Sequence, residues 1–143
     1  MKAIFSLLFL VLAITCTVIV QGTPYQKFKD QHYQYSMAKR DCDTSMNRVN
    51  NRYFPNQCKP VNSFITGTDM DGIKAVCDRA GVPYSKDGKV HRKSTQRFRV
   101  MTCRRNWDSE QPPCEYRAYE NFGFIVIDCN WEKLPVHYET IIY

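Results

Sequence analysis

The stretch Cys58-Lys59-Pro60-Val61-Asn62-Ser63-Phe64 places a lysine directly after a cysteine. If Cys58 forms a disulfide, the bridge holds the backbone that carries Lys59. Taken alone, Lys59 is most simply a solvated surface lysine, because lysines are almost never fully buried. This segment therefore indicates a function only in combination with the rest of the chain, including its other cysteines.

The chain of 143 residues opens on a segment typical of a secretory signal peptide, residues 1–22, in which Lys2 precedes the apolar run Ala3–Val20. No second hydrophobic run follows that could anchor the chain in a membrane. Removing the leader takes away Lys2 and Cys16, which lowers the net charge from +6 to +5. We therefore expect one secreted domain, residues 23–143, and not a multidomain enzyme or a cytosolic protein with reduced thiols.

An even set of cysteines in an exported chain indicates disulfides, although counting alone leaves their connectivity open. A structural zinc site is the alternative, but no cysteine pair has C-x₂-C spacing and the three histidines are far apart in sequence. We therefore expect no metal and no cofactor. The six cysteines of the predicted domain are Cys42, Cys58, Cys77, Cys103, Cys114 and Cys129.

The first half of the domain predicts helices. Thr23 followed by Pro24 is a helix start, and Tyr25, Phe28, His32 and Tyr35 then recur at helical spacing. A second helix is expected over 41–51, and a weaker third, interrupted by Gly72, over 69–77. In the second helix we expect Met46 and Val49 to face inward and Arg48 and Arg52 to face outward.

The second half predicts strands. Polar and apolar residues alternate over 97–100 and 114–118, while 122–129 is apolar at nearly every position and is expected to be the central strand. A last strand over 134–139 is expected to start at Pro135 or to lie at an edge. Residues 81–93, rich in turn-forming and basic residues, are expected to form an exposed loop. Helices placed early and strands placed late predict an α+β fold.

Two of the histidines are candidates for chemistry. A lone His32 on an apolar helix face is most simply a satisfied core residue. His137 lies two residues before Glu139, and on a strand this spacing puts both side chains on one face, where the carboxylate can orient the ring. Such pairs also occur on ordinary surfaces, so neither histidine alone indicates a function.

Together these segments resemble the pancreatic-type ribonuclease superfamily. Gln31-His32, the stretch from Cys58 to Phe64 and the run from Pro135 to Glu139 are similar to its three active-site segments. The family signature C-K-x-x-N-T-F is matched with Ser63 in place of threonine. The resemblance covers residues 23–143, and the six-cysteine pattern is similar to angiogenins and to fish ribonucleases.

The resemblance implies a V-shaped, twisted antiparallel sheet with three helices and an active site in its cleft. It also implies three bridges, Cys42–Cys103, Cys58–Cys114 and Cys77–Cys129. The expected activity is metal-independent endoribonuclease cleavage of single-stranded RNA after pyrimidines, by transesterification to a 2′,3′-cyclic phosphate.

The resemblance also implies a role for each site residue. His32 is the base, His137 the acid and Lys59 the cation that stabilises the developing negative charge. Gln31 is expected to bind the phosphate, and Glu139, where the family commonly has aspartate, to orient His137. The base-binding residues are Val61, Ser63 and Tyr138, and Lys27 is expected to bind a further phosphate. Thr140 stands where angiogenins carry an obstructing glutamine.

The positive charge suits RNA, but it also leaves open a second class of function, a cationic antibacterial or angiogenic effector with weak ribonuclease activity. Candidate partners beyond RNA are anionic bacterial surfaces, heparan-type glycans and a cytosolic ribonuclease inhibitor, and we expect a monomer. The basic residues that could form an anion-binding face are Arg92, Lys93, Arg97, Arg99, Arg104 and Arg105.

Overall fold

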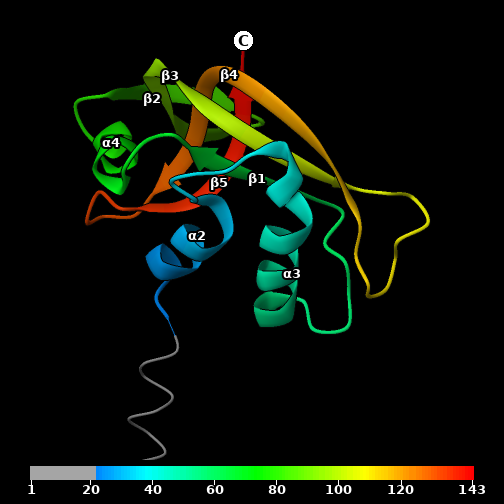
Figure 1. Ribbon diagram of the computed structural model, residues 1–143. Coiled ribbons are helices and arrows are strands. Elements are labelled where there is room, and N and C mark those ends of the chain that lie inside the picture. Colours follow the sequence, from blue (N-terminus) through cyan, green and yellow to red (C-terminus); the bar gives the residue numbers. More distant parts are fainter. Residues whose placement is uncertain (1–21) are drawn as a thin grey trace, which may run out of the picture.

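The computed structural model describes residues 22–143, which form three α-helices, two short 3-10 helices and an antiparallel sheet (Figure 1). The predicted leader, residues 1–22, lies outside this range except for its last residue, so the prediction of secretion stays a prediction. Among the described residues, no helix combines the length and the apolar character needed to cross a membrane.

Helix α2 (Pro24–His32) begins at the predicted cap, where the Thr23 hydroxyl accepts a hydrogen bond from the backbone N–H of Gln26 at 3.2 Å. It buries Phe28 against the sheet. The helix ends at His32 and the next residue is extended. Tyr35, which the spacing placed on the same helical stripe, is therefore outside the helix and exposed.

Helix α3 (Cys42–Tyr53), preceded by the 3-10 turn η1 (Lys39–Asp41), buries Met46 and Val49 as predicted. The third predicted helix is helix α4 (Met70–Lys74) followed by the 3-10 turn η2 (Ala75–Cys77). Its start is fixed by Asp69, whose carboxylate accepts a hydrogen bond from the N–H of Gly72 at 2.9 Å. All three helices are thus found close to their predicted positions.

The sheet has five antiparallel strands: β1 (Val61–Thr66), β2 (Gly81–Lys86), β3 (Lys89–Arg105), β4 (Tyr116–Cys129) and β5 (Pro135–Ile142). Their order is β1-β3-β4-β5, and β2 pairs with the first part of β3. Strand β4 is interior, and β5 is an edge strand that Pro135 begins, as predicted. The arrangement is an open sheet, which confirms the α+β class.

The prediction of an exposed loop over residues 81–93 is wrong. These residues form a hairpin, in which β2 pairs with the start of β3 around the turn residues Asp87 and Gly88. Both turn residues have positive φ, 51° and 75°, which the Asp-Gly sequence favours in a two-residue hairpin turn. The many charged residues hid this signal. The two separate strands predicted over 114–118 and 122–129 are likewise parts of the single strand β4.

Two buried clusters support the two ends of the sheet. One, built around Met46, Phe64 and Met101, lies between α3 and the sheet, and the other, built around Phe28, Ile65 and Ile127, lies under α2 and α4. The three predicted disulfides are confirmed: Cys42–Cys103, Cys58–Cys114 and Cys77–Cys129. Each closes a loop of more than 50 residues and so contributes about 4 kcal/mol through the unfolded state.

Candidate active site

Two adjoining hollows, of about 560 and 510 Å³, open where α2, β1 and β5 meet. Both are lined by His32, Lys59 and Tyr138. The first also contains Val61, Ser63 and Glu139, and the second Lys27, Gln31 and His137. The fold therefore brings every predicted site residue to one continuous cleft, although the three active-site segments are far apart in the sequence.

His32, the last residue of α2, is held by its Nδ1 atom, which lies 2.9 Å from the carbonyl oxygen of Ser63. A carbonyl oxygen only accepts, so Nδ1 carries the proton and Nε2 of the neutral ring is a free base. The ring is stacked on Tyr138, with 5.5 Å between the ring centres. Burial lowers the pKa of His32 to about 4, and the nearby positive charges of Lys59 and His137 act in the same direction.

The Lys59 ammonium lies beside His32 in both hollows. It donates to Oδ1 of Asn62 at 2.8 Å and to Oε1 of Gln31 at 3.5 Å. The Asn62 amide in turn donates to the backbone oxygen of Gln31 at 2.6 Å, which ties α2 to β1. Burial, together with the charge of Lys27, lowers the pKa of Lys59 to about 8. Nε2 of Gln31 is buried without a protein partner and is free to donate to a ligand.

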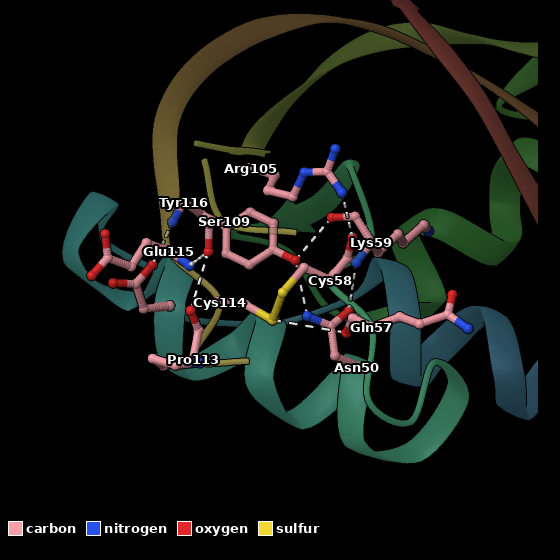
Figure 2. The surroundings of a disulfide bond; sticks show 11 residues. Asn50, Gln57, Cys58, Lys59, Arg105, Ser109, Pro113, Cys114, Glu115 and Tyr116 are labelled. Atoms are coloured by element: carbon pink, nitrogen blue, oxygen red, sulfur yellow. Dashed lines mark hydrogen bonds between the residues drawn. A yellow bond between two sulfur atoms is a disulfide. The ribbon is translucent and has the colours of Figure 1, made fainter. Parts of the chain in front are cut away.

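The backbone of Lys59 is fixed beside the Cys58–Cys114 bridge (Figure 2). Its N–H donates to Oδ1 of Asn50 at 3.1 Å, and its carbonyl accepts from the Tyr116 hydroxyl at 2.8 Å. Asn50 also donates to that hydroxyl at 2.9 Å, which closes a buried ring of hydrogen bonds. The family resemblance implied the bridge, but the sequence did not indicate the contacts of Asn50 and Tyr116, because nothing in a linear pattern pairs residues on α3 and β4.

His137 is held differently. On β5 its Nε2 atom lies 3.2 Å from Oε2 of Glu139, as the two-residue spacing predicts, and the side chain is 57% exposed. Oε1 of Glu139 accepts from the Lys86 ammonium at 3.2 Å. The hydrogen bond from Lys86 is the main reason that the pKa of Glu139 is lowered, and the bond to His137 adds to it. A carboxylate partner makes Nε2 the donor, so Nδ1 remains for a ligand.

The first hollow, which contains Val61 and Ser63, has the features of a pocket for a nucleotide base. The hydroxyl of Ser63 is 2.9 Å from that of Thr102, so Thr102 fixes its direction; the sequence did not identify Thr102. Val61 and Tyr138 form apolar walls. Burial raises the pKa of Tyr138 to about 12, so the phenol stays neutral. Thr140 lines the same hollow but its hydroxyl contacts the neighbouring backbone oxygen of Ile141 at 3.5 Å.

Comparison with known proteins identifies the chain. The pancreatic ribonuclease family model matches residues 23–139. The chain belongs to the pancreatic ribonuclease family. This ribonuclease is 36% identical over 128 residues to angiogenin-4 of Mus musculus, covering 90% of this chain and 85% of the relative. It is 41% identical over 123 residues to angiogenin-2 of Bos taurus, covering 83% and 94%.

Solved structures of similar proteins support this family assignment. Zebrafish RNase5 superposes on the ribonuclease with a TM-score of 0.69 and 35% identity, covering 81% of this chain and 92% of the other. Green turtle egg white ribonuclease gives 0.70 and 34%, covering 85% and 100%. The chain is a pancreatic-type endoribonuclease, and its substrate is RNA.

At the outer end of the cleft of the ribonuclease, Lys27 is exposed on α2 and shares a third hollow with Arg52. The carboxylate of Asp30, which replaces a basic residue common in the family, is bound by Arg52 at 3.0 Å and by the Tyr53 hydroxyl at 2.7 Å. The ion pair with Arg52 offsets the negative charge of Asp30 at this end of the cleft.

Half of the six candidate basic residues of β3 are hydrogen-bonded within the ribonuclease. Arg92 donates to the backbone oxygens of Val76, Asp78 and Gly81. Arg99 binds Glu120 and a backbone oxygen, and Arg105 binds the backbone oxygen of Cys58. These three arginines therefore hold loops together, which reduces the candidate anion-binding face to Lys93, Arg97 and Arg104.

One group of side chains has metal-ligand chemistry: His91, Asp128 and Glu139 offer ligand atoms within 4.8 Å of one another. His91 is already bonded to Asp128, with Nδ1 to Oδ1 at 2.5 Å. The Lys86 ammonium donates a hydrogen bond to Oε1 of Glu139. A divalent cation would have to displace this ammonium, so the group is better described as a charge network than as a metal centre.

Proposed function

We propose that this ribonuclease cleaves single-stranded RNA on the 3′ side of pyrimidines, with His32 as base, His137 as acid and Lys59 as the stabilising cation. The observation that carries the proposal is the fixed tautomer of His32: with Nδ1 bonded to Ser63, only Nε2 can take a proton. Its lowered pKa keeps it neutral at working pH, which a general base requires.

In the first step, Nε2 of His32 removes the proton of the ribose 2′-hydroxyl. The 2′-oxygen forms a bond to phosphorus, the bond from phosphorus to the 5′-oxygen breaks, and protonated His137 gives its Nδ1 proton to that leaving oxygen. The products are a 2′,3′-cyclic phosphate and a free 5′-hydroxyl. The ammonium of Lys59 and the unpartnered amide of Gln31 stabilise the charge on the phosphate oxygens.

In the second step, the cyclic phosphate is hydrolysed with the roles exchanged. His137 removes a proton from water while His32 returns a proton to the 2′-oxygen. RNA supplies the nucleophile of the first step, and in the second His137 activates the water that bonds to phosphorus as the bond to the 2′-oxygen breaks, so neither step calls for a metal ion. Two imidazoles can perform the proton transfers of both steps because each can be neutral in one step and charged in the other.

The preference for pyrimidines rests on Ser63. Its hydroxyl can donate and accept, so it can pair with the edge of either uracil or cytosine. The contact with Thr102 compensates for the methyl group that the family threonine would supply. Thr140 is shorter than the glutamine of angiogenins, so we expect base access to be less obstructed than in those relatives.

The test is cleavage of the dinucleotides CpA, UpA, ApA and GpA, in EDTA, with the products analysed for 2′,3′-cyclic phosphate. We expect the two pyrimidine substrates to be cleaved at least about tenfold faster than the purine ones. DNA dinucleotides, which lack the 2′-hydroxyl, should be inert. Loss of activity on chelation, or equal cleavage after purines, would contradict the proposal.

We also propose that the chain is exported, as its leader-like segment and disulfides indicate, and that it acts as a monomer. Antibacterial or angiogenic action, and binding to heparan-type glycans or to a ribonuclease inhibitor, are the alternatives for its biological role. The double variant His32→Ala/His137→Ala separates these roles from catalysis. Bactericidal action that survives this replacement comes from the cationic surface.

A further inference from the structure

The hairpin of β2 and β3 brings one lysine to the acid side of the active site. Lys86, the last residue of β2, donates to Oε1 of Glu139, while Oε2 of the same carboxylate contacts Nε2 of His137. Each oxygen of Glu139 thus has a different partner, 3.2 Å away in both cases. The side chains of Lys86 and Glu139 are 38% and 25% exposed, so the ion pair is partly shielded from water.

We propose that Lys86 is a positioning residue for RNA cleavage, which acts through Glu139 on the orientation and proton affinity of His137. A glutamate has one more rotatable bond than the aspartate that is common at this position, and an unanchored carboxylate would lose the contact with His137 more often. The ammonium of Lys86 removes that freedom. It also keeps Glu139 ionised, because a hydrogen bond to the charged form lowers the pKa of the carboxyl group.

The surrounding charges leave Lys86 as the anchor of this carboxylate. On β4, Asp128 lies directly across from His137 and could compete for the same imidazole. It is instead bonded to Nδ1 of His91 on β3, and His91 is buried. The hydrogen bond to His91 therefore keeps Asp128 from binding His137. The charge of His91 also stabilises the ionised form of Glu139. The charge of His137 also couples to that of His32 on α2.

The inference rests on the proposed function, because it assumes that His137 is the acid. The experiment compares Lys86→Ala and Lys86→Arg with Lys89→Ala. Lys89 is the cross-strand neighbour of Lys86 and is exposed, so its loss removes the same charge from the same hairpin without breaking the contact to Glu139. Cleavage of CpA gives kcat and KM, and an NMR titration of the His137 ring gives its pKa without reference to activity.

We expect Lys86→Ala to lower kcat about threefold to tenfold with little change in KM, and Lys86→Arg to restore most of the loss. Relative to Lys89→Ala, which loses the same charge, the pKa of His137 should be lower in Lys86→Ala, because an unanchored Glu139 stabilises the imidazolium less often. The loss of kcat should be clearly larger than in Lys89→Ala. In a Glu139→Ala background, the further replacement of Lys86 should change kcat by less than about 1.5-fold.

Two results would overturn the inference: a Lys86→Ala variant that matches Lys89→Ala in kcat and in the His137 titration, or losses from Lys86 and Glu139 that simply multiply in the double variant. A wild-type protein that fails to cleave CpA would instead overturn the proposed function, while the His137 titration would still decide whether Lys86 acts on that ring. Stabilisation of the protein by Zn²⁺ that depends on Glu139 would show a metal site and would also count against Lys86 as its partner.

Discussion

The two histidines face one cleft, but the protein holds them in opposite ways. His32 ends a helix, is stacked on Tyr138 and is tied to a backbone carbonyl, which the sheet itself keeps in place. His137 is mostly exposed on an edge strand and is held by a side chain that needs an anchor of its own. The proposed base is therefore preorganised by the core, whereas the proposed acid depends on surface contacts and keeps more freedom to change between steps.

Removing either ring should have the largest effect. We expect His32→Ala and His137→Ala each to lower kcat/KM for CpA by about 10²–10⁴-fold, because each removes one proton transfer. Hydrolysis of the cyclic phosphate should fall in both variants as well, since the same two groups serve the second step. A variant that lost less than tenfold would show that its ring is not one of the two catalytic groups.

The pH dependence of the reaction should reflect the burial of His32. His32 should titrate near pH 4, below its ordinary value of 6.5, so the acid limb of the kcat/KM profile should lie well below that expected from unperturbed histidines. The unfolded chain takes up this proton near 6.5 and the folded protein only near 4, so the contribution to stability is complete above pH 6.5 and is lost as pH falls toward 4. NMR titration and denaturation at several pH values measure both. A His32 midpoint at 6.5 would show that burial does not lower the pKa of this ring.

On the base side, a single replacement should damage both stability and activity. Asn62→Ala deletes the acceptor of Lys59 and the donor to the backbone of Gln31, and Asn62 is buried. We expect a loss of about 1–3 kcal/mol in the free energy of unfolding, because a buried carbonyl loses its partner. The kcat should fall as well, as Lys59 loses its position. An unchanged free energy of unfolding would show that the hydrogen bonds of Asn62 on the base side contribute little to stability.

On the acid side, the comparable replacement should affect activity alone. Glu139→Ala removes the partner of His137 from a partly exposed position, and we expect kcat to fall less than about tenfold with the unfolding free energy changed by less than about 1 kcal/mol. Urea denaturation and CpA cleavage of Asn62→Ala and Glu139→Ala, measured together, test the contrast directly. A large loss of stability in Glu139→Ala would mean that the contacts beside His137, like those beside His32, support the fold.

The sequence predicted those parts of the fold whose signals are local. Thr23 and Pro24 marked the start of α2, Pro135 the start of β5, and the spacing of His137 and Glu139 their contact on one face. The disulfide pairing and the residue roles came from family resemblance, because cysteine counting leaves connectivity open. The structure confirms the pairing and gathers the residues, while their roles remain proposals.

The contacts that the sequence missed join residues distant along the chain. Lys86 meets Glu139 only because the hairpin folds back over β5, and that hairpin was mistaken for a loop on account of its charges. Asn50 and Tyr116 meet through a buried pairing of α3 with β4, and Thr102 reaches Ser63 through the register of β1 and β3. Such contacts depend on register and docking, which no short pattern encodes.

The placement of the two rings at opposite ends of the described chain has a consequence for biosynthesis. His32 lies on the first helix and His137 on the last strand, so a nascent polypeptide still bound to the ribosome lacks the acid until β5 has been made. A fragment that ends before β5 does not hold both groups. On the proposed mechanism, a chain still in synthesis cannot carry out the two-histidine cleavage, since only a finished and folded molecule brings both rings to one cleft.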